Sequence, residues 1–157
     1  MDRTMWRLLK LLQENARLSL RQLGESIGLT APAVTERVRR LEDAGIIKGY
    51  YADIDLPKVG LPIMAFVHLT ANSAQSTAIR KAVHDLPEVM ECYCVTGIES
   101  YILKVACASV PHLEHFLLDL KDYGDVRTSL ILSTQVSRRV VDEWSLHPDE
   151  ERPQPKR

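Results

Sequence analysis

Cationic and hydroxyl side chains gather in the stretch from Thr30 to Arg40, and their chemistry suits nucleic acid. A guanidinium group binds phosphate oxygens or the acceptor edge of guanine, and a hydroxyl group can contact several base edges. If Val34, Val38 and Leu41 form the buried stripe of a helix, the other residues from position 32 to position 40 lie on its exposed side. These are Pro32, Ala33, Thr35, Glu36, Arg37, Arg39 and Arg40. A solvated helix face is the alternative, because charged residues are common on exposed helices.

Two short helices with a tight turn between them are expected to position these side chains. Ser19 can cap a first helix, which ends at Gly28 because glycine tolerates the left-handed conformation. Thr30 can cap a second helix, and Pro32 lies in its first turn, where a missing N–H costs nothing. This order is typical of a helix-turn-helix unit, whose second helix enters the major groove while the first crosses the DNA backbone.

The second helix is expected to divide its contacts between bases and phosphates. We predict that residues 32–37 face base edges and that Arg39 and Arg40 meet phosphates, which fix the register but carry no sequence information. Lys48, just beyond the helix, is a further phosphate candidate. The complete set of predicted DNA contacts is Arg21, Gln22, Thr30, Pro32, Ala33, Thr35, Glu36, Arg37, Arg39, Arg40 and Lys48.

Two stretches resemble a known family. LLKLLQENARLS follows Asp2 closely, and RQLGESIGLTAPAVTERVRRLEDAGIIKGYYADIDLPKVG follows in turn. Together they resemble the amino-terminal half of the Lrp/AsnC (leucine-responsive, or feast/famine) transcription regulators, and the likeness extends to about Ser137. TERVRRLEDAGIIKGY and the CYxxxG segment are most similar to the LrpC-like branch. The resemblance implies a sequence-specific DNA-binding transcriptional regulator, with an amino acid or related small molecule as candidate effector.

Composition and charge agree with a DNA-binding protein that works as an assembly. The chain has 157 residues, of which 45% are hydrophobic and 26% charged, as in ordinary globular domains. No apolar run is long enough for a membrane span and the first residues do not form a signal peptide, so we expect a cytoplasmic protein without a membrane partner. Residues 1–60 carry ten cations against eight anions, and residues 61–136 carry five against eight. DNA affinity must therefore come from clustered charges and several subunits acting together.

The carboxy-terminal part shows a strand-helix-strand pattern twice. Apolar alternation predicts strands at 61–70, 89–96, 101–108 and 126–136, with helices marked by Ile79 to Leu86 and by Leu113 to Leu120. The order βαββαβ is ferredoxin-like, so the predicted fold class is α+β, with a winged-helix-like helix-turn-helix domain in front. The predicted divisions are 1–50 for DNA binding, 51–60 as a hinge strand or linker, 61–137 for dimerisation and effector binding, and 138–157 as a largely disordered extension.

The predicted strands are apolar on both faces. In the first strand Ala65, Val67 and Leu69 point one way while Met64 and Phe66 point the other. Two helices can cover one face of a four-stranded sheet, and the other would be a large exposed apolar patch. We therefore predict at least a dimer, which also suits two DNA half-sites roughly 34 Å apart. By resemblance, the assembly is expected to be an octamer of four dimers.

The family resemblance also points to an effector loop. In that family, amino acids or related effectors bind at the loop between the second and third strands, where the sequence pattern is close to T-G-x-x-D-Y. The matching residues here are Thr96, Gly97, Ile98, Glu99, Ser100 and Tyr101. Ser100 stands where many members have an aspartate suited to an ammonium group, so amino-acid binding would require Glu99 to substitute for it. A simple glycine turn between two strands explains the same residues equally well.

Two other classes of function remain open at this point. An architectural protein that wraps or bridges DNA without an effector would use the same residues. A metabolite-binding enzyme of ferredoxin-like fold is the least favoured, because the chain has no nucleophile elbow, phosphate loop or HExxH motif. Three cysteines without CxxC spacing are expected to be buried thiols, so no disulfide, metal or cofactor is predicted.

Overall fold

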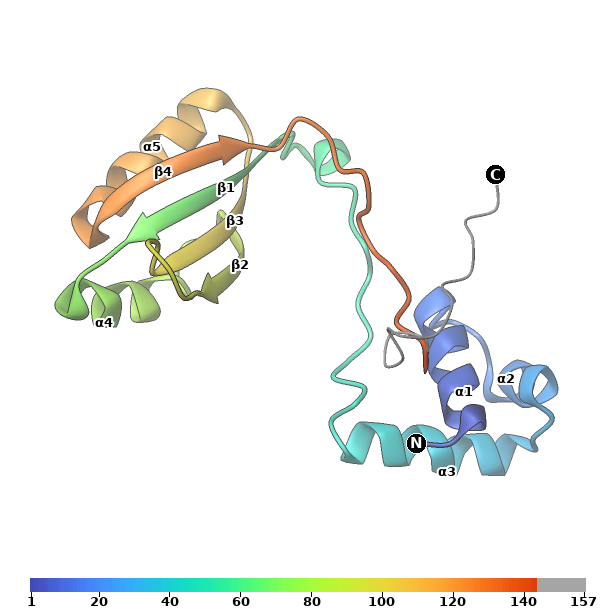
Figure 1. Cartoon of the computed structure of the whole chain (residues 1–157). Coiled ribbons are helices and arrows are strands. Elements are labelled where there is room, and N and C mark those ends of the chain that lie inside the picture. Colours follow the sequence, from blue (N-terminus) through green and yellow to red (C-terminus); the bar gives the residue numbers. More distant parts are fainter. Residues whose placement is uncertain (144–157) are drawn as a thin grey trace, which may run out of the picture. The chain divides into compact units, whose positions relative to one another are not determined.

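The computed structural model describes residues 1–143, which fall into two units. Met1–Ala52 and residues 136–143 form a helical unit, and Asp53–Gln135 form a sheet-containing unit (Figure 1). None of the helices in the described part of the chain is both long and apolar enough to span a membrane.

The helical unit consists of α1 (Arg3–Glu14), α2 (Leu20–Ile27) and α3 (Ala31–Asp43). The predicted cap at Ser19 is confirmed, because its hydroxyl accepts from the Gln22 N–H at 3.2 Å. The Gln22 side chain accepts from the Ser19 N–H at 2.9 Å, which completes a capping box. The turn at Gly28 is left-handed, with φ of +73°. Thr30 precedes α3 but makes no side-chain cap, so α3 begins with Pro32 in its first turn and no hydroxyl bond.

One apolar cluster joins the three helices. Its buried members are Leu8, Leu9, Leu12, Leu23, Val34 and Leu41. Val38, expected in the buried stripe of α3, is only half-buried at its edge. The close packing of α2 against the turn requires a glycine at position 24, because a Cβ there would lie 2.3 Å from the Leu29 carbonyl oxygen. The helix pair is therefore fixed by contact as well as by its caps.

The carboxy-terminal segment returns to α1. The Gln13 side chain donates to the Val141 carbonyl at 2.8 Å and accepts from the Val141 N–H at 2.9 Å. Arg138 donates to the Gln13 carbonyl at 2.6 Å. The segment 138–143 is thus bonded to the end of α1, while the rest of the extension predicted to be disordered, residues 144–157, lies outside the described residues.

The second unit is a four-stranded antiparallel sheet with the predicted ferredoxin-like topology. Its strand order is β2-β3-β1-β4, and every neighbouring pair is antiparallel. The elements are β1 (Ile63–Thr70), α4 (Ser73–Ala82), β2 (Val89–Cys94), β3 (Tyr101–Cys107), α5 (Val110–Leu120) and β4 (Asp125–Leu130). Ser109 caps α5, and its hydroxyl accepts from the His112 N–H at 3.2 Å.

Several boundaries differ from those predicted. α4 begins at Ser73, earlier than expected, because Asn72 and Gln75 form a capping box. β4 ends at Leu130, which pairs with Ala65. One further bond joins the Ile131 N–H to the Met64 carbonyl, and β1 begins at Ile63, so the chain cannot stay paired as far as residue 136. The possible hinge strand within 51–60 does not form: a strand needs a paired neighbour, and this segment has none in the sheet and contains only a 3-10 turn at Pro57–Val59.

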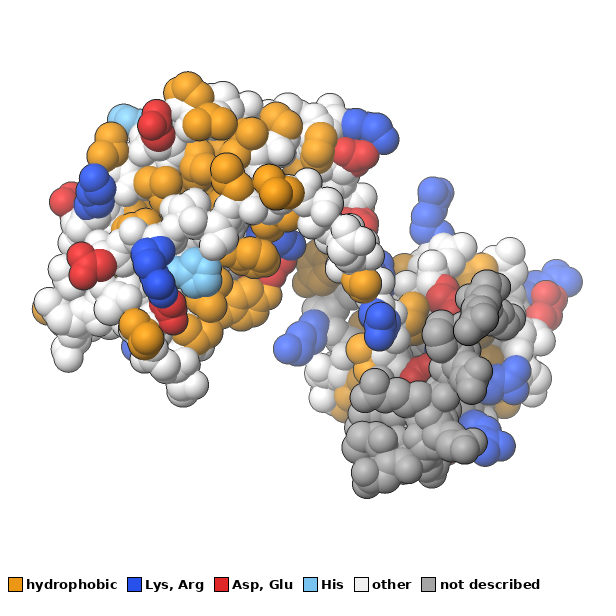
Figure 2. Space-filling view, turned by 45° about the horizontal axis from the view of Figure 1, so that its top comes forward, with side chains coloured by type: hydrophobic (Ala, Val, Ile, Leu, Met, Phe, Trp, Pro, Cys, Tyr) orange, Lys and Arg blue, Asp and Glu red, His pale blue; other side chains and the backbone are white. Residues whose placement is uncertain are grey.

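The two faces of the sheet have different surroundings. The face that carries Ala65, Val67 and Leu69 is buried beneath α4 and α5 by way of Ile79 and Phe116. No helix among the described residues packs on the opposite face, and Figure 2 shows many hydrophobic side chains gathered on the surface of this unit. Residues on that face include Met64, Phe66, His68, Tyr93, Ile102, Lys104, Ala106 and Arg127.

The cysteine prediction is only partly right. Cys107 is buried in the core, but Cys92 and Cys94 are exposed. Both lie on β2, an edge strand that pairs with β3 alone. Alternation in the sequence cannot show that a strand lies at an edge, where neither face is fully covered.

Candidate nucleic-acid interface and effector loop

The exposed side of α3 presents a small polar set near its start. Pro32 and Thr35 are exposed and Ala33 is half-buried. The Thr35 hydroxyl donates to the Ala31 carbonyl at 3.0 Å, so its two lone pairs remain available as acceptors. Thr30 is exposed beside them at the start of the helix. This part of α3 is therefore uncharged and sterically accessible.

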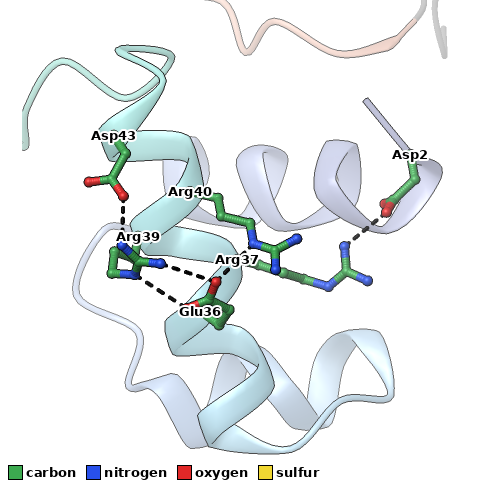
Figure 3. A network of polar contacts seen from close by, with 6 residues as sticks. All are labelled: Asp2, Glu36, Arg37, Arg39, Arg40 and Asp43. Atoms are coloured by element: carbon green, nitrogen blue, oxygen red, sulfur yellow. Dashed lines mark hydrogen bonds and ion pairs between the residues drawn. The ribbon is translucent and has the colours of Figure 1, made fainter.

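The next turns carry an ion-pair network centred on Glu36 (Figure 3). Arg39 donates to both oxygens of Glu36 at 3.2 Å, and Arg40 Nε donates to Glu36 Oε1 at 2.9 Å. Arg39 Nη1 also donates to Asp43 Oδ2 at 2.8 Å. Hydrogen bonds from Arg39, and then from Arg40, hold the pKa of Glu36 below its ordinary value. Both guanidinium groups stay accessible, with Arg39 60% and Arg40 67% exposed.

Arg37 differs from these two arginines because it turns toward α1. Its Nη1 donates to Asp2 Oδ2 at 2.9 Å, and its side chain is only 30% exposed. The other Asp2 oxygen accepts from the Met5 N–H at 2.7 Å at the start of α1. The pKa of Asp2 is lowered, first by the Met5 bond and then by Arg37. Arg37 therefore braces α1 against α3, as Figure 3 shows.

The remaining predicted DNA contacts are divided between two places. Arg21 is exposed on α2 and pairs with Glu25 at 2.8 Å, while Gln22 uses its oxygen in the capping box of the same helix. Lys48 is exposed beyond α3. All three belong to the helical unit. Sequence spacing alone could have indicated the Glu36–Arg40 and Arg39–Asp43 pairs, because residues four apart are neighbours on a helix.

The predicted effector loop joins β2 to β3 and is bonded to the end of β1. The Ser100 hydroxyl both accepts from the Ala71 N–H and donates to the Ala71 carbonyl, each at 3.1 Å. The Ser100 N–H donates to the Leu69 carbonyl at 2.8 Å. The Tyr101 hydroxyl donates to the Ser76 carbonyl at 3.2 Å. Ser100 and Tyr101 therefore hold the loop in place, and their polar atoms are already engaged.

The tip of the loop is the accessible part. Gly97 has φ of +124°, a conformation that favours glycine, and Thr96 and Ile98 are exposed beside it. Glu99 forms an ion pair with Arg127 of β4. Sequence reasoning missed Arg127, because 28 residues separate it from Glu99 and only strand pairing brings them together. The tip thus combines an anion, a cation and a glycine without a side chain.

A metal or cofactor site is not evident in the described part of the chain. Among residues 1–143, no three His, Cys, Asp or Glu side chains lie close enough together to hold a metal ion. His112 uses both ring nitrogens, with Nε2 2.9 Å from Glu88 Oε1 and Nδ1 accepting from the Ala108 N–H.

Comparison with known proteins agrees with both units. A family model for winged helix-turn-helix DNA-binding domains matches residues 1–48, and one for the Lrp/AsnC ligand-binding domain matches residues 64–141. The HTH-type transcriptional regulator LrpC of Bacillus subtilis is 38% identical over 122 residues, which cover 78% of this chain and 85% of that protein.

Solved structures give the same result. The structure of B. subtilis LrpC matches with a TM-score of 0.84 at 34% identity, over 88% of this chain and 99% of the other. The crystal structure of the transcriptional regulator NMB0573 in complex with L-Met, from Neisseria meningitidis, matches with a TM-score of 0.86 at 29% identity. That match covers 93% of this chain and 99% of the other.

A helix-turn-helix unit joined to a ferredoxin-like ligand-binding domain defines a class of transcriptional regulators. Within that class, this chain belongs to the Lrp/AsnC family. The resemblance predicted from the sequence is thereby confirmed, and with it a DNA-binding regulator of transcription whose ligand-binding domain suits modulation by an effector. The relatives named above are both named as transcriptional regulators. They also favour a regulator over the architectural alternative.

Proposed function

We propose that α3 enters the major groove and that Arg39 and Arg40 contact phosphates. The observation that carries this proposal is their exposure, 60% and 67%, on the helix that follows the glycine turn. Arg21 and Lys48, both exposed, add phosphate contacts at the edge of the same unit. The protein acts where the DNA is, which we propose to be the cytoplasm.

Base contacts come from the uncharged start of α3 in this proposal. Pro32, Ala33 and Thr35 are accessible there, with Thr30 and Gln22 as flanking contacts at the starts of the two helices. Glu36 follows one turn later. Arg37 receives a different role from the one its sequence position indicates. Its bond to Asp2 and its partial burial make it a positioning residue that fixes α1 relative to α3.

A double Arg39→Ala, Arg40→Ala variant tests the groove assignment. Binding to a 30-base-pair duplex by fluorescence anisotropy is expected to weaken, and the slope of log affinity against log salt is expected to fall in magnitude by about 1 to 2. The matched control is Arg80→Ala, Lys81→Ala, which removes two adjacent cations from α4 and should leave the slope unchanged. Equal slopes in the two double variants would refute the assignment.

The uncovered sheet face supports self-association. Its apolar residues on β1 and β3 require a cover, and a second copy provides the same surface in return. We propose a dimer formed through this face, with four dimers joined in an octamer as the family resemblance implies. A dimer presents two copies of α3, and simultaneous contact raises affinity without new contacts.

We also propose that the loop tip binds a free amino acid. The Glu99–Arg127 pair offers a carboxylate to the ammonium group and a guanidinium to the carboxylate of such a ligand, and Gly97 allows close approach of backbone N–H groups. Glu99 takes the place of the aspartate that Ser100 replaces. Because the Neisseria relative's structure is named as an L-Met complex, methionine is the first amino acid to test.

Thermal unfolding with each of the twenty amino acids tests the effector proposal. A ligand at about 100 times its dissociation constant adds roughly 2.7 kcal/mol of stability, which raises the unfolding midpoint clearly. The shift should disappear in Glu99→Gln and remain in Glu91→Gln, whose carboxylate lies on β2 and pairs with Lys104. If no amino acid shifts the midpoint, the protein regulates without this class of effector.

A further inference from the structure

The exposed cations of α3 are balanced by anions on the same helix. Arg39 and Arg40 make three hydrogen bonds to Glu36, and Arg39 makes a fourth to Asp43. The formal charges of these side chains sum to zero. Figure 3 shows the Glu36 carboxylate between the two guanidinium groups. The arginines that are to meet phosphates are thus already bonded to a carboxylate before DNA arrives.

From this geometry we propose that Glu36 is a specificity-determining residue, which competes with DNA phosphates for Arg39 and Arg40. When the arginines bind phosphates instead, the Glu36 carboxylate loses their hydrogen bonds, and only a base with a hydrogen-bond donor opposite Glu36 replaces them. The inference rests on the proposed role of α3 in the groove. Phosphate contacts are the same on every sequence, so the competition weakens binding to every sequence. Recognition then depends on what happens to the released carboxylate.

A released carboxylate needs a hydrogen-bond donor in the groove. In the free protein Glu36 accepts three bonds from arginines, and leaving it without a donor beside a polyanion is costly. The major groove offers two amino groups as donors, cytosine N4 and adenine N6. A base pair that places one of them opposite Glu36 compensates the lost bonds. On DNA sequences without such a base pair, the lost hydrogen bonds of Glu36 are not replaced and binding is weaker. The competition for the arginines therefore makes the protein discriminate between DNA sequences.

Glu42 provides a matched comparison on the same helix. Its side chain carries the same charge, but it accepts from the Tyr50 hydroxyl at 3.0 Å and contacts neither arginine of the network. Replacing Glu42 by alanine therefore changes the net charge as much as replacing Glu36, without freeing Arg39 or Arg40. Asp43 is an intermediate case, because it holds Arg39 alone.

The experiment compares Glu36→Ala with Glu42→Ala on two 30-base-pair duplexes, one of random sequence and one selected from a random pool by the wild-type protein. On the random duplex, Glu36→Ala should bind about three- to tenfold tighter, with a salt slope steeper by about 1 to 2. The ratio of selected to random affinity should fall. Asp43→Ala should show a smaller gain, and circular dichroism checks that each variant is folded.

Three results would overturn the inference. Equal affinities of Glu36→Ala and Glu42→Ala for the random duplex would show that no competition exists. An equal loss on both duplexes would show that Glu36 only positions the arginines. An unchanged selected-to-random ratio would remove the discrimination.

Adding Glu36→Ala to the Arg39→Ala, Arg40→Ala variant separates this inference from the proposed function. The gain from removing Glu36 should vanish in that background. If instead the double arginine variant alone binds both duplexes normally, the groove assignment fails and the role of Glu36 fails with it.

Discussion

The two units differ in how much of their apolar surface is covered, and how many of their charged side chains are paired, within one copy of the chain. In the helical unit the buried apolar side chains meet in one shared cluster, and the charged side chains of α3 bond to one another, to Asp2 or to the Tyr50 hydroxyl. In the sheet unit the helices cover one face, and the other carries Phe66 and Ile102 toward solvent. His68 Nδ1 is buried there without a hydrogen-bond partner in the described part of the chain. The helices of the first unit bury a shared apolar cluster within one copy of the chain, whereas the described residues leave one face of the sheet without a covering helix.

The largest expected effect on stability comes from two substitutions that each create a cavity, one in the core of each unit. They also test whether the two units unfold independently. Leu8→Ala in the helical cluster and Leu103→Ala in the sheet core each remove a fully buried side chain. Each should lower the free energy of unfolding of its own unit by about 2–5 kcal/mol. Hydrogen exchange resolved by peptide measures both units in each variant. Equal loss of protection in both units would show one cooperative structure instead of two.

Charging the open sheet face should break self-association. Phe66→Lys places an added ammonium group on the open face of β1, opposite Lys104 of β3, and a second copy could cover that face only by burying the charge. Sedimentation velocity should show a smaller species than for the wild type. Leu118→Lys, an equally large exposed apolar residue on α5, is the control and should leave the assembly intact. If Leu118→Lys dissociates the protein and Phe66→Lys does not, the assembly uses the helical face of the sheet unit.

Removing a cap should have an effect of about 1 kcal/mol confined to the helical unit. Ser19→Ala leaves the Gln22 N–H without the hydroxyl that caps α2. Thr30→Ala is the control, because Thr30 makes no side-chain cap to α3. Chemical denaturation should show a smaller loss of stability for Thr30→Ala. Equal losses would mean that the Ser19 hydroxyl bond contributes nothing beyond its backbone conformation.

The smallest expected effect is a loss of stability at acid pH. The pKa of Asp2 is held below 3.8, first by the Met5 N–H and then by Arg37. A carboxyl group whose folded pKa is depressed stabilises the folded state above its unfolded pKa, and this contribution is lost as the pH falls through the folded pKa. The thermal unfolding midpoint of the helical unit should therefore decrease when the pH falls below about 4, and this decrease should be smaller in Asp2→Asn. An unchanged acid profile in Asp2→Asn would show that the Arg37 brace carries no pH dependence.

Much of the fold could be predicted because its signals are local or periodic. Ser19, Gly28 and Ser109 begin or end helices by bonds and backbone conformations within a few residues. The alternation of strand residues separated the two faces of β1, and the structure buries the face with Ala65, Val67 and Leu69. The errors lie where a partner determines the outcome, as at the end of β4 and in the exposure of Cys92 on the edge strand.

The sequence by itself determined the family, the two-part organisation and the face of α3 that carries cations. Spacing, caps and motif wording are properties of neighbouring residues, so they can be read without coordinates. Only the tertiary structure decided that Arg37 turns to Asp2 and that Arg127 meets Glu99, residues 35 and 28 positions apart. Such pairs form when separate elements pack together, and a one-dimensional pattern does not record which side chains then face each other.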